Sequence, residues 1–319
     1  MILKTRSKKS LAILLAFLPA VMAAQTSAPD QKPLVPPLPT PILLDTDIGS
    51  DIDDAFALAL VLRSPELDLV GVTTVSGDTQ ARARLAARML IDSGHDLVPV
   101  AAGEPGKPLA IDQTHLADGF EGPPMVTQPA VEFMRDRIER ASRPLTLVAI
   151  GPLTNVGQLI TRYPATAKKL TRIVLMGGSI HFGYGKSSKP VAEYNIVSDV
   201  KAAQVVFSSG IPMFVAPLDA TAMLRLNAAG RKRIFQHHTA ITDDLARLYR
   251  LWGHPTPILF DPLAVTMLID PSLCRTKPLD LEVDNKGFTR VRRGPANAVV
   301  ALSSDKEKFF ELMYRRVAP

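Results

Sequence analysis

The sequence predicts an α/β protein built on an open, mainly parallel sheet with helices on both faces. Two patterns lead to this prediction. From residue 41 onward, short apolar, β-branched runs alternate with longer amphipathic segments, which is typical of strands covered by helices on both sides. Polar, glycine-containing stretches directly follow most of the apolar runs, as they do at the ligand-binding edge of such a sheet.

The expected elements follow one another in order along the chain. Six apolar runs predict strands at 41–45, 67–75, 97–102, 145–151, 172–178 and 211–217. Helical periodicity predicts helices at 54–62, 80–93, 130–140 and 199–209. Two later runs, 278–284 and 297–304, are candidates for antiparallel additions. A closing helix over 305–317 has Ser303 or Ser304 as its candidate cap. Because no linker interrupts 41–319, we expect a single domain there.

The first 40 residues are expected to lie outside this fold. Residues 1–24 combine basic residues with an apolar run that ends in small residues, the pattern of a cleaved secretory signal peptide. Residues 25–40 are expected to form a proline-rich leader. We therefore expect a periplasmic or secreted protein with no stable membrane anchor after cleavage.

Charge and cysteine content exclude other classes of protein. The formal net charge is +6, but the signal peptide carries four of the basic residues. The mature chain therefore keeps no basic stripe that would bind nucleic acid. Cys274 is the only cysteine, which leaves no internal disulfide.

Five aspartates crowd the segment around the end of the first expected strand: Asp45, Asp47, Asp51, Asp53 and Asp54. Carboxylates this close raise one another's pKa unless a cation supplies compensating charge. An all-oxygen, carboxylate-rich site suits a hard cation, Ca²⁺ or Mg²⁺, better than zinc. Solvated acids that cap a helix are the simpler interpretation, but they account for only one or two of the five.

Two other aspartate-rich sites fit less well. An EF-hand loop needs glutamate at its twelfth position, and counting from either of the first two aspartates reaches Phe56 or Leu58. A phosphatase of the haloacid dehalogenase type also begins with an aspartate pair after its first strand. It needs a threonine or serine and a lysine at later strand ends, where this chain has GPLTN and GGS.

Six ordered motifs resemble those of the inosine/uridine-preferring nucleoside hydrolases: DTDIGSDIDDAFAL, GVTTVSGD, AIGPLTNV, VLMGGS, VAEYN and FDPLAV. Together they cover essentially all of 41–319. The resemblance implies a Rossmann-like nucleoside hydrolase fold with one Ca²⁺ at the bottom of its pocket. It also implies hydrolysis of the N-glycosidic bond of ribonucleosides to ribose and free base.

The resemblance further implies roles for individual residues. The Ca²⁺ would be held by oxygens of four residues: Asp47, Asp54, Asp261 and, through its backbone carbonyl, Thr154. Asp47 would also be the general base on the attacking water. The ribose would be bound by Asp53, Glu193 and Asn195. Carboxylates suit this chemistry because bond breakage passes through a ribosyl cation.

The half of the site that would bind the nucleobase departs from the family pattern. Phe260 stands where the better-studied members have a histidine. Asp78, a candidate substrate contact, stands where many members have asparagine, and Ser187 replaces another asparagine. The GSDIDD segment is two residues longer than the common form, which leaves Asp51 without an assigned role.

The missing histidine leaves open which acid protonates the departing base. Trp252 and His254 lie just upstream of Phe260, where the indole could stack on a base and His254 could protonate it. An ordinary helix end with core aromatics is an equal alternative. His115 is the second candidate acid, because it aligns with a family loop that reaches the sugar or base.

The function that these patterns favour is a Ca²⁺-dependent ribonucleoside hydrolase acting on a small-molecule nucleoside. The alternative is a metal-dependent nucleoside- or ribose-binding protein with weak or no turnover. The nucleobase preference stays open. So does the assembly, for which a homodimer and a homotetramer are both candidates.

Overall fold

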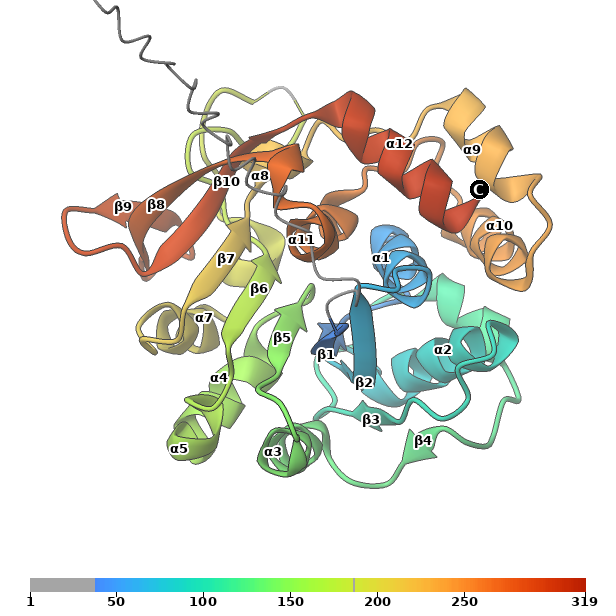
Figure 1. Cartoon of the computed structure of the whole chain (residues 1–319), viewed down its shortest axis with the longest axis horizontal. Helices are drawn as coiled ribbons and strands as arrows, with labels where there is room; N and C mark the ends of the chain where they lie inside the picture. Colours follow the sequence, from blue (N-terminus) through green and yellow to red (C-terminus); the bar gives the residue numbers. More distant parts are fainter. Residues whose placement is uncertain (1–37, 186) are drawn as a thin grey trace, which may run out of the picture. The chain divides into compact units, whose positions relative to one another are not determined.

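A ten-stranded sheet runs through the structure, a computed structural model that describes residues 38–185 and 187–319. Its strand order is β4-β3-β2-β1-β5-β6-β7-β10-β8-β9 (Figure 1). The strands are β1 Thr40–Thr46, β2 Leu67–Thr74, β3 Val100–Ala102, β4 Met125–Val126, β5 Thr146–Ala149, β6 Arg172–Met176, β7 Met213–Ala216, β8 Cys274–Val283, β9 Thr289–Arg292 and β10 Ala298–Ser304. Every neighbouring pair from β4 to β10 is parallel, which confirms the predicted open, mainly parallel sheet.

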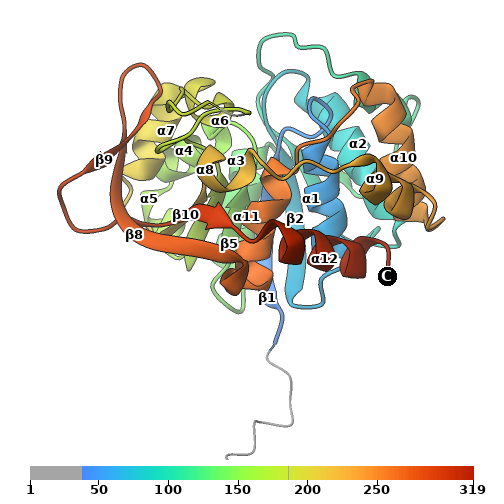
Figure 2. The ribbon, with the colours of Figure 1, turned by 90° about the horizontal axis from the view of Figure 1, so that it is seen from above.

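The C-terminal strands differ from the prediction in one respect. β8 is antiparallel to β10, and β9 is antiparallel to β8, as expected of late additions. The run 297–304, the second candidate for an antiparallel addition, forms β10, which is antiparallel to β8 but parallel to β7. The chain first forms the β8–β9 ribbon at one end of the sheet (Figure 2) and then returns between β7 and β8. Apolar periodicity carries no information on that direction.

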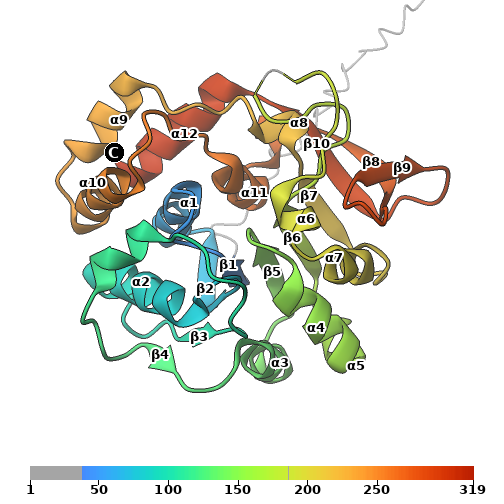
Figure 3. The ribbon, with the colours of Figure 1, turned by 180° about the vertical axis from the view of Figure 1, so that it is seen from behind.

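Helices cover both faces of the sheet (Figures 1 and 3). The four predicted helices are α1 Asp53–Leu62, α2 Thr79–Asp92, α3 Ala130–Arg140 and α7 Val200–Phe207. The others are α4 Thr154–Arg162, α5 Pro164–Ala167, α6 Tyr194–Val197, α8 Leu218–Thr221, α9 Ala228–Phe235, α10 Ala240–Trp252, α11 Phe260–Ile269 and α12 Lys306–Val317, with the short 3₁₀ segments η1 Asp112–Ala117 and η2 Pro271–Leu273. Residues of α1, α2, α11 and α12 share one core, and residues of α3, α4 and α7 share the other.

Alternation along β1 shows how the sheet separates the two cores. Ile42 and Leu44 belong to one core, whereas Leu43 belongs to the other, as the two-residue period of a strand requires. The helix that follows, α1, packs against α11, α10 and α12 as well as β2, and nine of its ten residues are buried. Its first turn, which carries Asp53 and Asp54, is therefore buried too.

The closing helix α12 has a different cap from the one predicted. The Asp305 carboxylate accepts a hydrogen bond from the Lys308 N–H at 3.1 Å. Ser304 still belongs to β10 and donates its hydroxyl to the Ala220 carbonyl. The prediction of Ser303 or Ser304 was wrong because the strand continues to the residue directly before the cap.

Two findings concern the chain ends and the membrane. Among the described residues, no helix combines the length and apolar character needed to cross a membrane. The predicted signal peptide and most of the predicted leader, residues 1–37, lie outside the described residues.

We expect Gly157→Leu to destabilise the fold, because Gly157 of α4 packs tightly against Ala202 of α7. A Cβ at this position would lie 2.7 Å from Ala202 Cβ and 2.8 Å from Ala202 Cα. Overpacking of this kind costs about 1–3 kcal/mol, and each kcal/mol lowers Tm by about 2–4 °C in a chain of this size. Calorimetry should show that loss, while Lys201→Leu on the exposed side of α7 keeps Tm within a degree or so. Equal Tm values for the two variants would contradict the packing.

Candidate active site

The candidate site lies at the carboxyl ends of β1 and β5. β1 pairs with β2 on one side and with β5 on the other, so the strand order reverses between them. Ligands of open parallel sheets bind at such a point. A cavity of about 320 Å³ lies there, lined by Asp47, Ser50, Asp51, Asp53, Asp54, Leu109, Ala110, Ile150, Met176, Tyr184, Glu193, Tyr194, Asn195, Phe260 and Asp261.

The turn between β1 and α1 brings the acids to this cavity. Gly49 has a φ of +114°, and a Cβ there would lie 3.0 Å from Thr114 Cγ2, so glycine is required at this position. The chain can therefore turn tightly and begin α1 at Asp53. Asp53 and Asp54 then occupy the first turn, where the helix dipole favours negative charge.

Three carboxylates form the densest acidic cluster of the site, here called the acid trio. Oxygens of Asp53, Asp54 and Asp261 lie within 4.8 Å of one another, and each residue is only 3% exposed. Asp261 comes from the first turn of α11 and donates its backbone N–H to Asp53 Oδ2 at 3.2 Å. The Thr46 hydroxyl donates to Asp54 Oδ1. Two helix starts, 208 residues apart in the sequence, thus meet at one point.

Burial and repulsion between carboxylates dominate the electrostatics of the acid trio. Burial raises the pKa of Asp53, Asp54 and Asp261 well above the usual range, and the neighbouring carboxylates raise it further. Three carboxylate oxygens at this spacing form a hard, all-oxygen donor set. Such a set fits Ca²⁺ or Mg²⁺ better than a softer metal.

Asp47 stands beside the trio and lines the same cavity. Its charge raises the pKa of both Asp54 and Asp261, so it belongs to the same electrostatic system. Burial raises the pKa of Asp47 itself to about 6, and the Arg82 guanidinium opposes that rise. Gly151 leaves room for the carboxylate, since a Cβ there would lie 2.9 Å from Asp47 Oδ1.

Asp45 lies behind the cavity and has a structural environment. Its Oδ1 accepts hydrogen bonds from Thr73 Oγ1 at 2.6 Å and Asn155 Nδ2 at 2.9 Å. Its Oδ2 is buried and has no hydrogen-bond donor among the described residues. Burial raises the pKa of Asp45 to about 7, although both hydrogen bonds lower it. Asp45 therefore supports the strand end.

Glu193 and Asn195 line the opposite wall and are fixed by the backbone. Glu193 caps α6, and its carboxylate accepts the N–H groups of Asn195 at 3.0 Å and Gly178 at 2.9 Å. Asn195 Nδ2 donates to the carbonyls of Ile150 at 3.0 Å and Met176 at 3.2 Å. Burial raises the pKa of Glu193 to about 7. Both side chains thus reach the cavity in fixed orientations.

Asp51, from the two-residue extension, connects α10 to the mouth of the cavity. It lines the cavity, and the Trp252 side chain lies near enough to lower its pKa. Partial removal from water raises the pKa of Asp51, whereas the Ile52 N–H, the nearby His254 and the Trp252 side chain lower it. The Trp252 and His254 rings pack edge to face with centroids 4.9 Å apart. Trp252 is also the last residue of α10 and packs partly on the core, as the helix-end interpretation expects, while the role of Trp252 and His254 toward a base stays a prediction.

Five predicted site residues are absent from the cavity lining. Two of them are Trp252 and His254, and the other three make contacts elsewhere. His115 is exposed on η1 and pairs with Asp118 at 2.9 Å. Asp78 is the N-cap of α2 and accepts the Ala81 N–H at 2.9 Å. Thr154 begins α4, and its hydroxyl donates to Asp199 Oδ2 at 2.8 Å.

The aromatic wall of the cavity was only partly predicted. Phe260, which replaces the family histidine, packs edge to face with Tyr184 at a centroid distance of 6.0 Å. The Tyr184 hydroxyl donates to Glu193 Oε1 at 3.4 Å and accepts the Tyr194 N–H at 3.0 Å. Tyr184 was missed. The signal that could have found it is its place in the glycine-rich stretch between β6 and Glu193.

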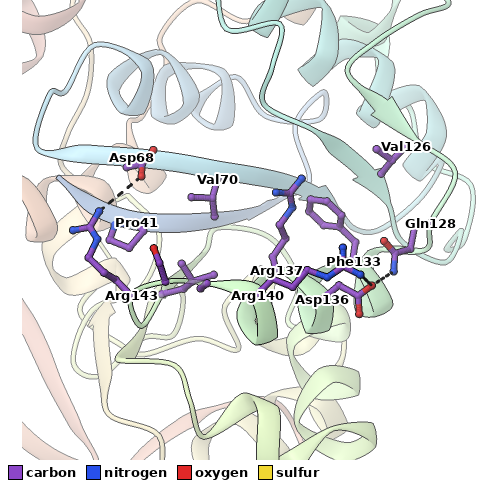
Figure 4. Close-up of a pocket in the computed structure, with 13 residues that line it drawn as sticks. Pro41, Asp68, Val70, Val126, Gln128, Phe133, Asp136, Arg137, Arg140 and Arg143 are labelled. Carbon is purple, nitrogen blue, oxygen red and sulfur yellow. Dashed lines mark hydrogen bonds and ion pairs between the residues drawn. The ribbon is translucent and has the colours of Figure 1, made fainter. Parts of the chain in front are cut away.

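A second hollow of about 400 Å³ lies near the start of β1 and β2, beside α3 (Figure 4). Arginines there face aspartates, with Arg143 3.9 Å from Asp68 and Arg140 3.8 Å from Asp136. Its other walls are largely apolar, and none of the predicted site residues lines it. The smaller cavity at β1 and β5 is therefore the candidate active site.

Comparison with known proteins gives one consistent result. The family model of the inosine-uridine preferring nucleoside hydrolases matches residues 42–311. The chain is 32% identical over 311 residues to the pyrimidine-specific ribonucleoside hydrolase RihA of Citrobacter koseri, covering 87% of this chain and 98% of that protein.

Solved structures agree with this match. The plant nucleoside hydrolase PpNRh1 superposes with a TM-score of 0.78 at 24% identity, over 88% of this chain and 100% of that one. The purine-preferring ribonucleoside hydrolase from Gardnerella vaginalis gives a TM-score of 0.75 at 25% identity, over 88% and 98%. The fold of this chain is that of the nucleoside hydrolases.

We expect Asp45→Asn to change how stability depends on pH. Because burial raises the pKa of Asp45 from its ordinary 3.8 to about 7, the stability that its protonated form gives is full below about pH 4. That stability is lost as the pH rises to about 7. In metal-free buffer, the Tm of the variant relative to wild type should therefore increase between pH 5 and pH 8. Asp68→Asn, at an exposed ion pair, should show no such trend. A Tm difference that is the same at every pH would contradict the buried charge.

Proposed function

The chain belongs to the inosine-uridine preferring nucleoside hydrolase family, and from that membership we propose that it is a Ca²⁺-dependent ribonucleoside hydrolase. It would release ribose and a free base from a small-molecule nucleoside. The observation that carries the proposal is the acid trio, placed beside Asp47 in the cavity at the sheet's reversal point. The periplasmic or secreted location expected from residues 1–24 remains part of this proposal.

The proposed ion ligands follow from the donor set. Asp54 and Asp261 belong both to the acid trio and to the ligand set that the family resemblance implies. Asp53 is the third member of the trio, although the resemblance gives it to the ribose. Asp47 and the Thr154 carbonyl would complete the site. When bound, the cation would hold the ribose hydroxyls and acidify a water molecule.

Asp47 is the proposed general base. Its carboxylate would take a proton from the attacking water as the water oxygen bonds to the anomeric carbon. The bond between that carbon and the base nitrogen breaks, and its electron pair leaves with the base. The surrounding carboxylates stabilise the positive charge that develops on the ribosyl group. Asn195 uses its Nδ2 on two backbone carbonyls, which leaves Oδ1 to accept a ribose hydroxyl.

The leaving base must gain a proton, and His254 is the proposed donor. His254 packs on Trp252, and both side chains lie near Asp51, which lines the cavity. His115 stays the second candidate, although it is exposed and paired with Asp118. Phe260 and Tyr184 offer an apolar aromatic wall to the base. Pyrimidine nucleosides are the proposed first substrates because the RihA relatives are named pyrimidine-specific.

Asp261→Asn tests the metal assignment, because it removes one charge from the trio with little change in size. We expect the Ca²⁺ dissociation constant to rise by roughly tenfold or more and ribose release from uridine to fall with it. Isothermal titration and a reducing-sugar assay measure the two effects. Asp118→Asn, at an exposed ion pair, is the matched control. Unchanged Ca²⁺ affinity in Asp261→Asn would remove the acid trio from the proposal.

His254→Ala tests the source of the proton. We expect kcat on uridine to fall by roughly 10²-fold, with a much smaller effect on 4-nitrophenyl riboside, whose leaving group needs no proton. His115→Ala is the parallel variant. If both variants keep kcat/KM on uridine within a fewfold of wild type, neither histidine is the acid. A wild-type protein that binds uridine with Ca²⁺ but releases no ribose would instead be the binding protein.

A further inference from the structure

Arg82, on α2, is the largest fully buried residue among those that the structure describes. Each nitrogen of its guanidinium donates a hydrogen bond. Nε donates to the Ser76 carbonyl at 2.7 Å, and Nη2 donates to Ser50 Oγ at 2.7 Å. Nη1 donates to the carbonyl of Asp47 and, at 2.9 Å, to that of Ile48. A single side chain thus holds both sides of the turn that follows β1.

The acceptors of Arg82 are all neutral oxygens, three backbone carbonyls and one hydroxyl. A buried cation among neutral acceptors is costly unless charge nearby compensates for it. Asp47 and Asp54 supply the compensating negative charge, since the Arg82 guanidinium lowers the pKa of both. Arg82 therefore combines a geometric contact with the turn and an electrostatic contact with the acids.

The segment between Asp47 and Asp53, which includes Ser50 and Asp51, is held from a second side. Gln113 on η1 is buried, and its Nε2 donates to the carbonyls of Ser50 at 3.0 Å and Asp51 at 2.9 Å. The segment that joins Asp47 to Asp53 is thus fixed by α2 and by η1. Its conformation sets the spacing between Asp47 and the acid trio.

We propose that Arg82 is the positioning residue of this turn: by holding the carbonyls of Asp47 and Ile48 and the Ser50 hydroxyl, it sets the Asp47 carboxylate against the acid trio. The inference rests on the proposed function for the role of Asp47, but its primary readout is metal binding. Arg82 itself does not line the cavity.

The test compares Ca²⁺ binding in folded variants. Arg82→Met removes all the donors and the charge, Arg82→Lys keeps the charge with fewer donors, and Ser50→Ala removes one acceptor. Arg88→Met is the matched control, because Arg88 lies on the same helix and pairs with Asp92 at 2.7 Å. Near-ultraviolet circular dichroism and Tm in chelator establish folding. Isothermal titration with CaCl₂ then gives the affinity, and ribose release gives kcat and KM.

We expect Arg82→Met to weaken Ca²⁺ binding by roughly tenfold or more and to lower kcat more than it raises KM. Arg82→Lys should recover part of both losses, and Arg88→Met should match wild type. A merely structural arginine would lower Tm and leave the Ca²⁺ affinity of the folded protein unchanged. If Arg82→Met does not fold, Arg82→Lys provides the test, and we expect it to bind Ca²⁺ more weakly than wild type. Wild-type affinity and kcat in Arg82→Lys and Ser50→Ala would then overturn the proposal.

The two proposals fail in different ways. A wild-type protein that binds Ca²⁺ but releases no ribose would contradict the proposed hydrolase activity. The Ca²⁺ affinities of the variants would still test the positioning role of Arg82. A wild-type protein that hydrolyses nucleosides without Ca²⁺ would contradict the metal assignment, and the change in kcat would then judge Arg82. If wild type is active and binds Ca²⁺, and the Arg82 variants keep its Ca²⁺ affinity and kcat, only the Arg82 proposal is contradicted.

Discussion

Repulsion among buried carboxylates is the constraint on which the site depends. Asp53, Asp54 and Asp261 meet within 4.8 Å in the protein interior, where burial and like charge both favour their neutral forms. The fold imposes this arrangement, because α1 is buried on nearly all sides and α11 begins against its first turn. A divalent cation would relieve the repulsion, so the site that is costly to fold is also the site prepared for an ion.

The surrounding residues keep this strained group in place without neutralising it. Thr46 holds Asp54, the Asp261 backbone holds Asp53, and Arg82 holds the turn that carries Asp47. Across the cavity, Glu193 and Asn195 are fixed by backbone groups. The polar groups that would face the ribose therefore have set orientations before a ligand arrives, which is the arrangement that favours catalysis by preorganisation.

The sequence predicted the sheet and the acidic loop because both are local patterns. Apolar runs locate the strands, and five aspartates in ten residues announce the site. The sequence could not predict which carboxylates come together, since Asp261 lies 208 residues from Asp53 along the chain. An arginine in an amphipathic helix is usually taken for a solvent-facing residue, so the buried Arg82 gave no signal. His115 and Asp78 instead found local partners, an ion pair and a helix cap, which only the packed structure reveals.

A crystal structure of residues 38–319 grown with Ca²⁺ would test most directly whether the buried carboxylates hold a cation. We expect one ion in the cavity, with carboxylate oxygens of Asp54 and Asp261 about 2.3–2.6 Å away. Anomalous scattering would identify the element. Well-defined carboxylates with no ion between them at saturating Ca²⁺, or an ion bound elsewhere while nucleosides are still hydrolysed, would contradict this expectation.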